Sequence, residues 1–274
     1  MSTNILKRNA IMASAKTGIE WTDKTWNPVT GCHKVSPGCA NCYAEAVTRR
    51  FGINGGKFDE VVLHFDRLNQ PLRWRNPSRI FVNSMSDLFH KDVPDDFIDE
   101  VFAVMALSPK HTFQILTKRP ERMLAYLKGN CQWGIANYVD EISGEPFAHS
   151  KIKWPIPNVW LGVSVESQAY VNRIDLLRQC PAAVRFISCE PLLGPLELDL
   201  TGIHWVIVGG ESGAGCRPIK PEWVQSIRDQ CQSAGVAFFF KQWGGTTPKK
   251  NGNLLNGEQF LEFPKASDMI KVAG

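Results

Sequence analysis

Three cysteines, Cys32, Cys39 and Cys42, lie within eleven positions of the stretch "GCHKVSPGCANC". The last two form a C-x-x-C pair, whose two intervening residues can make a tight turn and bring both sulfurs to one metal centre. Gly31 and Gly38 each stand directly before a cysteine, where they allow the backbone to bend. The pattern indicates a loop that folds around a bound group.

Three kinds of chemistry fit these thiols. A structural zinc site needs four protein ligands, and the fourth would be His33, which is adjacent to Cys32, or a distant residue. A redox pair needs the C-x-x-C alone and leaves Cys32 without a role. An iron–sulfur cluster held by three cysteines leaves one iron open to a small molecule, which gives a physical reason for stopping at three. We favour the cluster and keep zinc as the alternative.

The composition is that of a globular protein able to bury a core. The chain has 274 residues, of which 43% are hydrophobic and 21% charged, and its formal net charge of +4 permits contact with nucleic acid without indicating it. Its eight cysteines without an export signal predict a reducing, cytoplasmic location. The absence of a run of eighteen apolar residues predicts no membrane span. Residues 1–16 are expected to form a flexible N-terminal extension.

Beyond the cysteines, β-type and helix-type segments alternate along the chain. Runs rich in Val, Ile, Leu, Phe and Trp predict strands within 18–26, 79–89, 111–120, 158–167, 184–192, 203–213 and 236–245. Apolar residues at helical spacing predict helices over 94–108, over 167–180 with Ser167 as the cap, and over 220–235. This alternation is typical of parallel strands joined by helical crossovers.

We therefore predict an α/β fold, a partial or irregular (β/α) barrel of six to seven mostly parallel strands. The barrel-like domain is expected to span 17–245, with the cysteine loop at 31–43 and an insertion at 129–157. Residues 246–274 are predicted to form a C-terminal turn or hairpin segment, because "KKNGN" and "LNGEQ" are turn signals.

Charged and hydroxylated residues follow the predicted strands, where the carboxyl ends of parallel strands meet at one mouth. They are Asp87, Thr117, Lys118, Arg119, Ser164, Glu166, Glu190, Glu211, Ser212, Lys241 and Gln242. As a set they predict a pocket lining. For any one of them the competing interpretation is an internal ion pair, such as Glu190 or Glu211 with Lys118 or Lys241.

A strand, a three-cysteine loop and a (β/α) partial barrel together resemble the radical S-adenosylmethionine (SAM) superfamily. More closely, the chain resembles a phage-associated family of proteins of unknown function. This resemblance covers roughly residues 18–264, and its motifs are "DKTWNPVTGC…VSPGCANCYAEA", "LTKRPERM", "SCEPLLGPL", "VGGESG" and "FFFKQWGG". Two features depart from the superfamily pattern: the first gap between cysteines has six residues, and Asn41 stands where an aromatic is usual.

The superfamily resemblance implies that Cys32, Cys39 and Cys42 ligate three irons of a 4Fe–4S cluster. The amino and carboxylate groups of SAM would take the fourth iron, and an electron donor would reduce the cluster, so that SAM is cleaved to methionine and a 5′-deoxyadenosyl radical. The candidate SAM contacts are Tyr43, Ser164, Glu166, Gly209, Gly210 and Glu211. Candidates for substrate contact or proton handling are Lys118, Arg119, Glu190 and Lys241.

The function expected from these observations is that of a radical SAM-type enzyme acting on a nucleic acid or nucleotide. A zinc-stabilised nucleic-acid-binding module without catalysis is the alternative. A third hypothesis is a metal-free hydrolase or lyase that uses Glu190, Glu211 and Lys118 at the barrel mouth.

Overall fold

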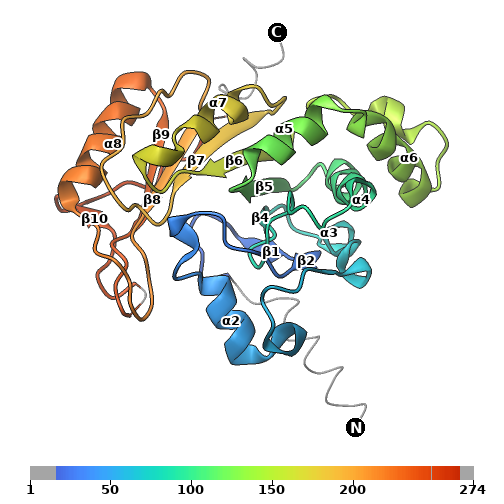
Figure 1. Ribbon diagram of the computed structural model, residues 1–274. Helices are drawn as coiled ribbons and strands as arrows, with labels where there is room; N and C mark the ends of the chain where they lie inside the picture. Colours follow the sequence, from blue (N-terminus) through green and yellow to red (C-terminus); the bar gives the residue numbers. More distant parts are fainter. Residues whose placement is uncertain (1–16, 248, 266–274) are drawn as a thin grey trace.

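A curved, seven-stranded parallel sheet forms the framework of the protein (Figure 1). The computed structural model describes residues 17–247 and 249–265. Within this sheet each strand lies beside the strand that follows it in the sequence, which is the order found in the wall of a barrel. The other short strands form two separate two-stranded pairs. Across the sheet the strands are β1 (Lys24–Trp26), β4 (Arg79–Val82), β5 (Thr112–Thr117), β6 (Val159–Ser164), β7 (Val184–Cys189), β8 (Trp205–Gly209) and β9 (Ala237–Gln242).

Helices connect these strands and cover the outside of the sheet, and α6 and α8 lie at opposite ends of the molecule (Figure 1). The α-helices are α2 (Tyr43–Phe51), α3 (Gln70–Arg73), α4 (Asp95–Ala106), α5 (Pro120–Lys128), α6 (Cys131–Ser143), α7 (Asn172–Arg178) and α8 (Pro221–Ala234). No helix in the described part of the chain is long and apolar enough to cross a membrane.

Side chains alternate between two cores, one on each face of the sheet. Residues such as Ile80, Phe113 and Val206 pack with the helices in the outer core. Their neighbours, including Phe81 and Trp205, point to the inner face and form a second, aromatic core. This period of two continues past the strand ends, so that residues in register with the inner core reach the open end of the barrel.

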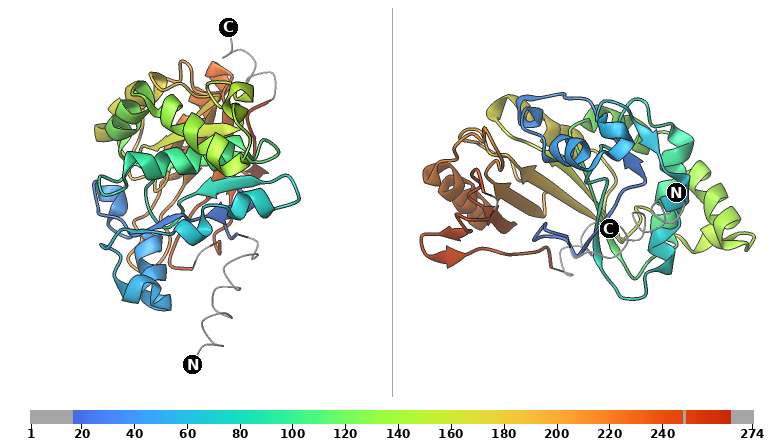
Figure 2. Two further views of the ribbon diagram at one scale, coloured as in Figure 1. Left: turned by 90° about the vertical axis from the view of Figure 1, so that its right-hand side faces the viewer. Right: turned by 90° about the horizontal axis from the view of Figure 1, so that it is seen from below.

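The cysteine loop lies on an excursion between β1 and β4. A short antiparallel pair, β2 (Val29–Thr30) with β3 (Val62–Leu63), closes the base of this excursion. Seen from below, the segment that carries the loop and α2, in blue, lies between the β8–β9 side and the α4–α6 side of the molecule (Figure 2).

The predicted fold class is confirmed, and all seven predicted strands are present. Two helical predictions need adjustment. The helix expected from Ser167 begins only at Asn172, after a 3₁₀ turn, and the Ser167 side chain makes no capping hydrogen bond. The segment 129–157, expected to be an insertion, holds α6, which packs against α4 through Cys131, Ile135 and Val139.

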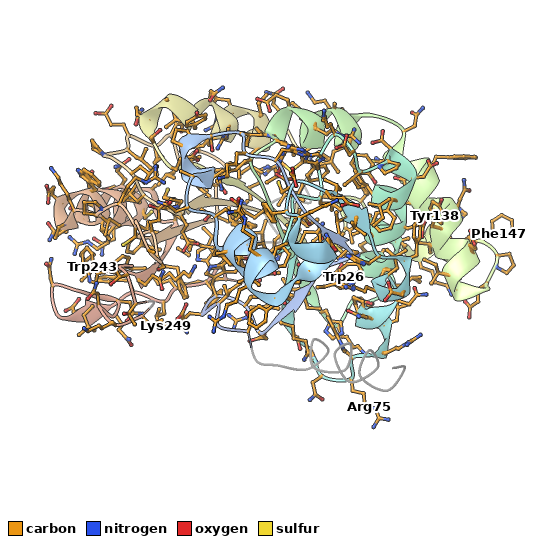
Figure 3. All side chains as sticks on the ribbon, turned by 60° about the horizontal axis from the view of Figure 1, so that its bottom comes forward. Trp26, Arg75, Tyr138, Phe147, Trp243 and Lys249 are labelled. Carbon is orange, nitrogen blue, oxygen red and sulfur yellow. The ribbon has the colours of Figure 1, made fainter. Side chains whose placement is uncertain are left out.

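The C-terminal end of the described chain carries a short hairpin. The short strands β10 (Leu254–Leu255) and β11 (Glu258–Gln259) pair as an antiparallel hairpin within the predicted C-terminal segment. Figure 3 shows Trp243 and Lys249 on the side of the molecule opposite Phe147. The predicted N-terminal extension, residues 1–16, lies outside the described residues.

Candidate functional site

A cavity of about 600 Å³ opens at the carboxyl ends of the strands. All three clustered cysteines line it, although they come from a loop that is separate in sequence from most of the sheet. The polar residues that the sequence predicts to converge there and that do line the cavity are Tyr43, Asp87, Thr117, Lys118, Arg119, Ser164, Glu190, Gly210, Glu211, Ser212, Lys241 and Gln242. Its volume lies within the range of ligand pockets, roughly 300–1,000 Å³.

The local sequence shapes the cysteine loop. Gly31 has φ +89°, and the carbonyl oxygen of Glu60 lies where a side chain at Gly31 would begin. A 3₁₀ turn, Pro37–Cys39, then carries Cys39, and Cys42 is the N-cap residue of α2. The thiols are thus fixed at a strand exit, in a tight turn and at a helix start.

The three thiols are unpaired and partly enclosed. Burial, together with the nearby Asp87 carboxylate, raises the pKa of Cys32 to about 11, although Arg119 opposes this shift. Burial also raises the pKa of Cys42. Binding of a metal by these thiols would therefore release protons.

The spacing of the sulfurs bears on the kind of centre they can hold. Among the described residues, the only group of three or more possible ligands whose atoms all lie within 4.8 Å of one another is His33, His90 and Asp92. The three cysteine sulfurs are therefore more widely spread. A single zinc ion with Zn–S bonds of about 2.3 Å would draw three sulfurs to within about 3.8 Å of one another.

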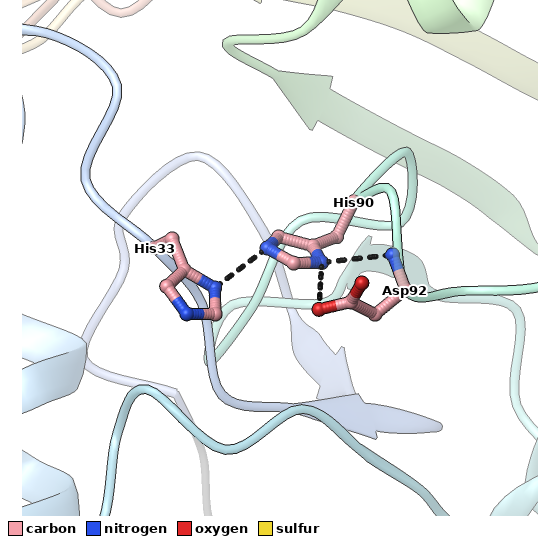
Figure 4. A group of neighbouring side chains, drawn as sticks. All are labelled: His33, His90 and Asp92. Atoms are coloured by element: carbon pink, nitrogen blue, oxygen red, sulfur yellow. Dashed lines mark hydrogen bonds and ion pairs between the residues drawn. The ribbon is translucent and has the colours of Figure 1, made fainter.

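The group of His33, His90 and Asp92 is a hydrogen-bonded chain (Figure 4). The backbone N–H of Asp92 donates to Nδ1 of His90 at 3.1 Å, so the ring proton of neutral His90 resides on Nε2. That Nε2 lies 2.9 Å from Nδ1 of His33 and donates to it. Burial lowers the pKa of His90, in keeping with a neutral ring. The lone pairs on Nδ1 of His90 and Nδ1 of His33 therefore both accept hydrogen bonds, and the His33 ring is turned toward His90.

A buried carboxylate anchors the first part of the cysteine loop. Asp87, which is 5% exposed, forms an ion pair of 2.9 Å with Arg119. Arg119 in turn donates to the backbone oxygen of His33 at 2.9 Å and contacts Sγ of Cys32 at 3.5 Å. Arg119 therefore joins the end of β5 to Cys32 and His33 at the start of the cysteine loop.

A second buried carboxylate holds the middle of the loop. Glu166 has no exposed surface, pairs with the buried Arg173 at 3.0 Å and accepts a hydrogen bond from the backbone N–H of Gly38 at 3.4 Å. It is outside the residues that line the cavity. In this structure the Glu166 carboxylate supports the loop between Cys32 and Cys39.

A third carboxylate, Glu211, fixes the loop beside the last two cysteines. It accepts hydrogen bonds from Arg217 and from Nδ2 of Asn41, the latter at 2.9 Å. Arg217 also donates to the backbone oxygen of Pro37 at 3.0 Å. Burial alone would raise the pKa of Glu211, but the hydrogen bonds from Arg217 and Asn41 outweigh it and lower the pKa. Asn41 thus fastens the loop to the end of β8.

The other predicted residues fall into two groups. Glu190 pairs with Lys241 at 2.9 Å and accepts a hydrogen bond from Ser188, so the internal ion pair considered from the sequence is present. Glu190 and Glu211 are thus both in ion pairs, with Lys241 and Arg217 respectively. In contrast, the Lys118 ammonium has no ion-pair partner among the described side chains and lies near the Cys42 thiol.

Gly209 and Gly210, the two glycines named as candidate SAM contacts, both lie where close packing leaves no room for a side chain. A Cβ on Gly210 would lie 2.0 Å from the backbone oxygen of Trp243, and one on Gly209 would lie 2.6 Å from Oε1 of Glu190. Gly210 lines the cavity, and Gly209 lies behind it. Tyr43 also lines the cavity, and its hydroxyl donates to the backbone oxygen of Ser84.

Sequence reasoning missed the wall of the cavity on the side of β1 and β4. Trp21, Phe81 and Asn83 line the cavity there, and Ser188 lines it from β7. The alternation of strand residues could have placed Phe81, Asn83 and Ser188 on the inner face. Trp21 precedes β1 and gave no comparable signal.

Comparisons with known proteins place the chain as follows. No curated protein matches its sequence. A structure of spore photoproduct lyase complexed with dinucleoside spore photoproduct is similar with a TM-score of 0.45 and 11% identity, over 73% of this chain and 59% of that one. A single-substitution mutant of that lyase gives a TM-score of 0.43 and 12% identity, over 72% and 58%. The chain thus spans about three fifths of the length of these structures. A family model matches residues 16–264, and the chain belongs to that family, which is described as "Protein of unknown function (DUF5131)".

Proposed function

We propose that this protein is a radical SAM-type enzyme in which Cys32, Cys39 and Cys42 hold a 4Fe–4S cluster. The observation that carries the proposal is the placement of the three thiols. They come from one loop, line one cavity and face the carboxyl ends of seven parallel strands. That edge of a barrel is where active sites lie.

The donor set fits such a cluster. Three thiolates can ligate three irons and leave the fourth open to a small molecule. Each thiol would then bind a different iron, so the three sulfurs can lie farther apart than around a single zinc ion. The sulfurs of Cys32, Cys39 and Cys42 are spaced more widely than a single zinc ion would require. His33, the candidate fourth zinc ligand, instead accepts a hydrogen bond from His90. These features support a cluster over a single zinc ion.

When bound, a reduced cluster and SAM supply a carbon-centred radical able to remove hydrogen from a substrate. The chain's own residues would hold the loop and shield this reaction from water. Arg119, Glu166 and Arg217 each bond to the loop backbone, at His33, Gly38 and Pro37, and so fix the loop at three points.

The remaining polar lining would hold SAM and the substrate. Ser164, at the end of β6, is the proposed SAM contact, and the Glu190–Lys241 pair, at the ends of β7 and β9, would contact the substrate or handle protons. Lys118, the unpaired cation, would face an anionic group or move a proton. An electron donor and a nucleotide or nucleic-acid substrate complete the proposal.

Anaerobic reconstitution with iron and sulfide tests the proposal. We expect about four irons and four sulfides per chain, and the addition of dithionite and SAM should give 5′-deoxyadenosine and methionine. The variant with Cys32, Cys39 and Cys42 all replaced by alanine should bind no cluster. Cys216→Ala is the matched control, because Cys216 is also a partly buried free thiol but lies outside the cavity lining.

Two results would contradict the proposal. One is a wild-type protein that takes up no iron without oxygen but retains about one zinc per chain in air. The other is iron binding that survives in the triple variant.

A further inference from the structure

The cavity has a wall that the proposed cluster and SAM contacts leave unused. Trp21, Phe81 and Asn83 form it, next to β1 and on β4, across the sheet from the ends of β6 to β9. Two of these three side chains carry a buried hydrogen-bond donor that has no partner among the residues the structure describes. Buried polar groups in folded proteins are nearly always paired, so each such donor calls for an explanation.

Asn83 is held in an unusual conformation with one end of its amide free. Its φ is +59°, its backbone N–H donates to Trp26 at 2.7 Å, and its Oδ1 accepts from the N–H of Val29 at 3.2 Å. The Val29 contact fixes which end of the amide is the oxygen. Nδ2 is therefore a donor, and it has no acceptor within residues 17–247 and 249–265 although Asn83 is only 3% exposed.

Trp21 presents a second donor on the same wall. The residue is 2% exposed, and its Nε1–H has no acceptor in the described part of the chain. Its ring lies 4.7 Å from the ring of Phe81, tilted by 57°. The wall thus combines two aromatic side chains with two N–H donors.

Above this wall, toward the mouth, lies the unpaired Lys118. It follows β5, the neighbour of β4, and Val82 pairs in register with Ile115. Lys118 is therefore on the strand next to Asn83 and nearer the open end. Lys118 lines the same cavity as this wall and the cysteine loop.

We propose that this wall binds the base of a nucleotide substrate, with its phosphate at Lys118. A nucleobase is a flat ring that packs against aromatic side chains, and its carbonyl and ring-nitrogen acceptors would satisfy Asn83 and Trp21. The soft χ2 torsion of asparagine lets its amide turn toward an acceptor placed against it. The assignment as a substrate site rests on the proposed function, whereas binding itself needs neither cluster nor SAM.

Equilibrium dialysis of the cluster-free protein with each of the four deoxynucleoside 5′-monophosphates tests the proposal. Asn83→Gly removes the donor at a φ that glycine adopts freely, and Trp21→Phe removes Nε1–H while keeping an aromatic ring. Each variant should weaken binding about tenfold, the effect of one lost buried hydrogen bond. Lys118→Met should weaken nucleotide binding about tenfold and leave the binding of the matching nucleosides unchanged.

Matched controls separate these effects from general destabilisation. Asn256→Gly makes the same change at an exposed asparagine with φ +54°, and Trp133→Phe does so at a 74% exposed tryptophan on α6. Both should bind nucleotides like the wild type. A thermal melt of each variant shows that it is folded.

The adenine of SAM has the same chemistry as a substrate base, so S-adenosylhomocysteine is a second probe. If the wall belongs to the substrate, Asn83→Gly leaves the binding of this probe unchanged. An equal loss for both probes would assign the wall to the cofactor and overturn the proposal. Absence of nucleotide binding by the wild type, or unchanged binding by both wall variants, would also overturn it. Failure of the cluster test alone would leave the dialysis result standing.

Discussion

Replacement of Asp87 by asparagine should destabilise the protein far more than the same replacement at Asp95. Both carboxylates pair with an arginine, Asp87 with Arg119 at 2.9 Å and Asp95 with Arg122 at 2.7 Å. Their burial differs: the side chains of Asp87 and Arg119 are 8% and 14% exposed, whereas those of Asp95 and Arg122 are 60% and 30% exposed.

The hydrogen bonds of Asp87 explain why asparagine cannot replace it. Oδ1 accepts from the backbone N–H of Phe89 at 3.0 Å, and Oδ2 accepts from the backbone N–H of Lys118 at 3.1 Å. An asparagine NH₂ would face one of these donors in either orientation, and Arg119 would lose its counter-ion. Breaking a buried pair in this way costs about 3–5 kcal/mol, whereas a surface pair contributes at most about 1 kcal/mol.

Calorimetric melting measures the difference. For a chain of this size 1 kcal/mol corresponds to about 2–4 °C in Tm, so Asp87→Asn should lower Tm by about 6–12 °C or more. Asp95→Asn should lower it by no more than about 4 °C. Because Arg119 contacts Cys32 and His33, we also expect faster labelling of Cys32 by a thiol reagent in Asp87→Asn alone. Equal, small changes in Tm for the two variants would refute the reasoning that Asp87 anchors the loop.

Three further predictions follow from burial and packing. The pKa of Glu211 is lowered, so the stabilising contribution of its carboxylate is present above its unfolded pKa of about 4.3 and is lost as pH falls through the lower folded value. In urea titrations from pH 7 to pH 3, Glu211→Gln should therefore lose less stability than the wild type. Parallel curves of stability against pH for the two proteins would contradict this. Burial raises the pKa of Asp99 to about 6, so its protonated form favours folding, and stability falls as pH rises from the unfolded pKa of about 3.9 to the folded value. Asp99→Asn should remove this fall in urea titrations between about pH 4 and pH 6, and a fall that persists in the variant would count against it. A Cβ on Gly162 would lie 2.4 Å from the Phe186 ring, whereas one on Gly194 meets nothing within 4 Å. Gly162→Ala should therefore lower Tm by several degrees, corresponding to about 1–3 kcal/mol, and Gly194→Ala should leave Tm unchanged. Equal melting temperatures for the two variants would disprove the packing argument.

The sequence by itself determined the framework and the place of the cysteines. Strands buried on both faces appear as continuous apolar runs, so segments such as 158–167 and 236–245 could be recognised without a structure. Three thiols within eleven residues cannot lie far apart, and parallel strands bring their carboxyl ends to one edge whatever the details of packing. The convergence of the loop, Ser164 and Lys241 on one cavity followed from these two constraints.

Only the tertiary structure decided what each polar residue does there. Glu166 and Glu211 share the strand-end position of Ser164, yet both hold the cysteine loop. Glu166 accepts a hydrogen bond from Gly38 directly, and Glu211 acts through Asn41 and Arg217. Alternation along β4 could place Phe81 and Asn83 on the inner face, but nothing in the sequence puts Trp21 beside them on one wall of the cavity. The physical reason is that an ion pair or an unpaired donor depends on which elements are neighbours and where side chains point. Those relations arise between residues such as Asn41 and Glu211, which lie far apart along the chain and meet only after folding.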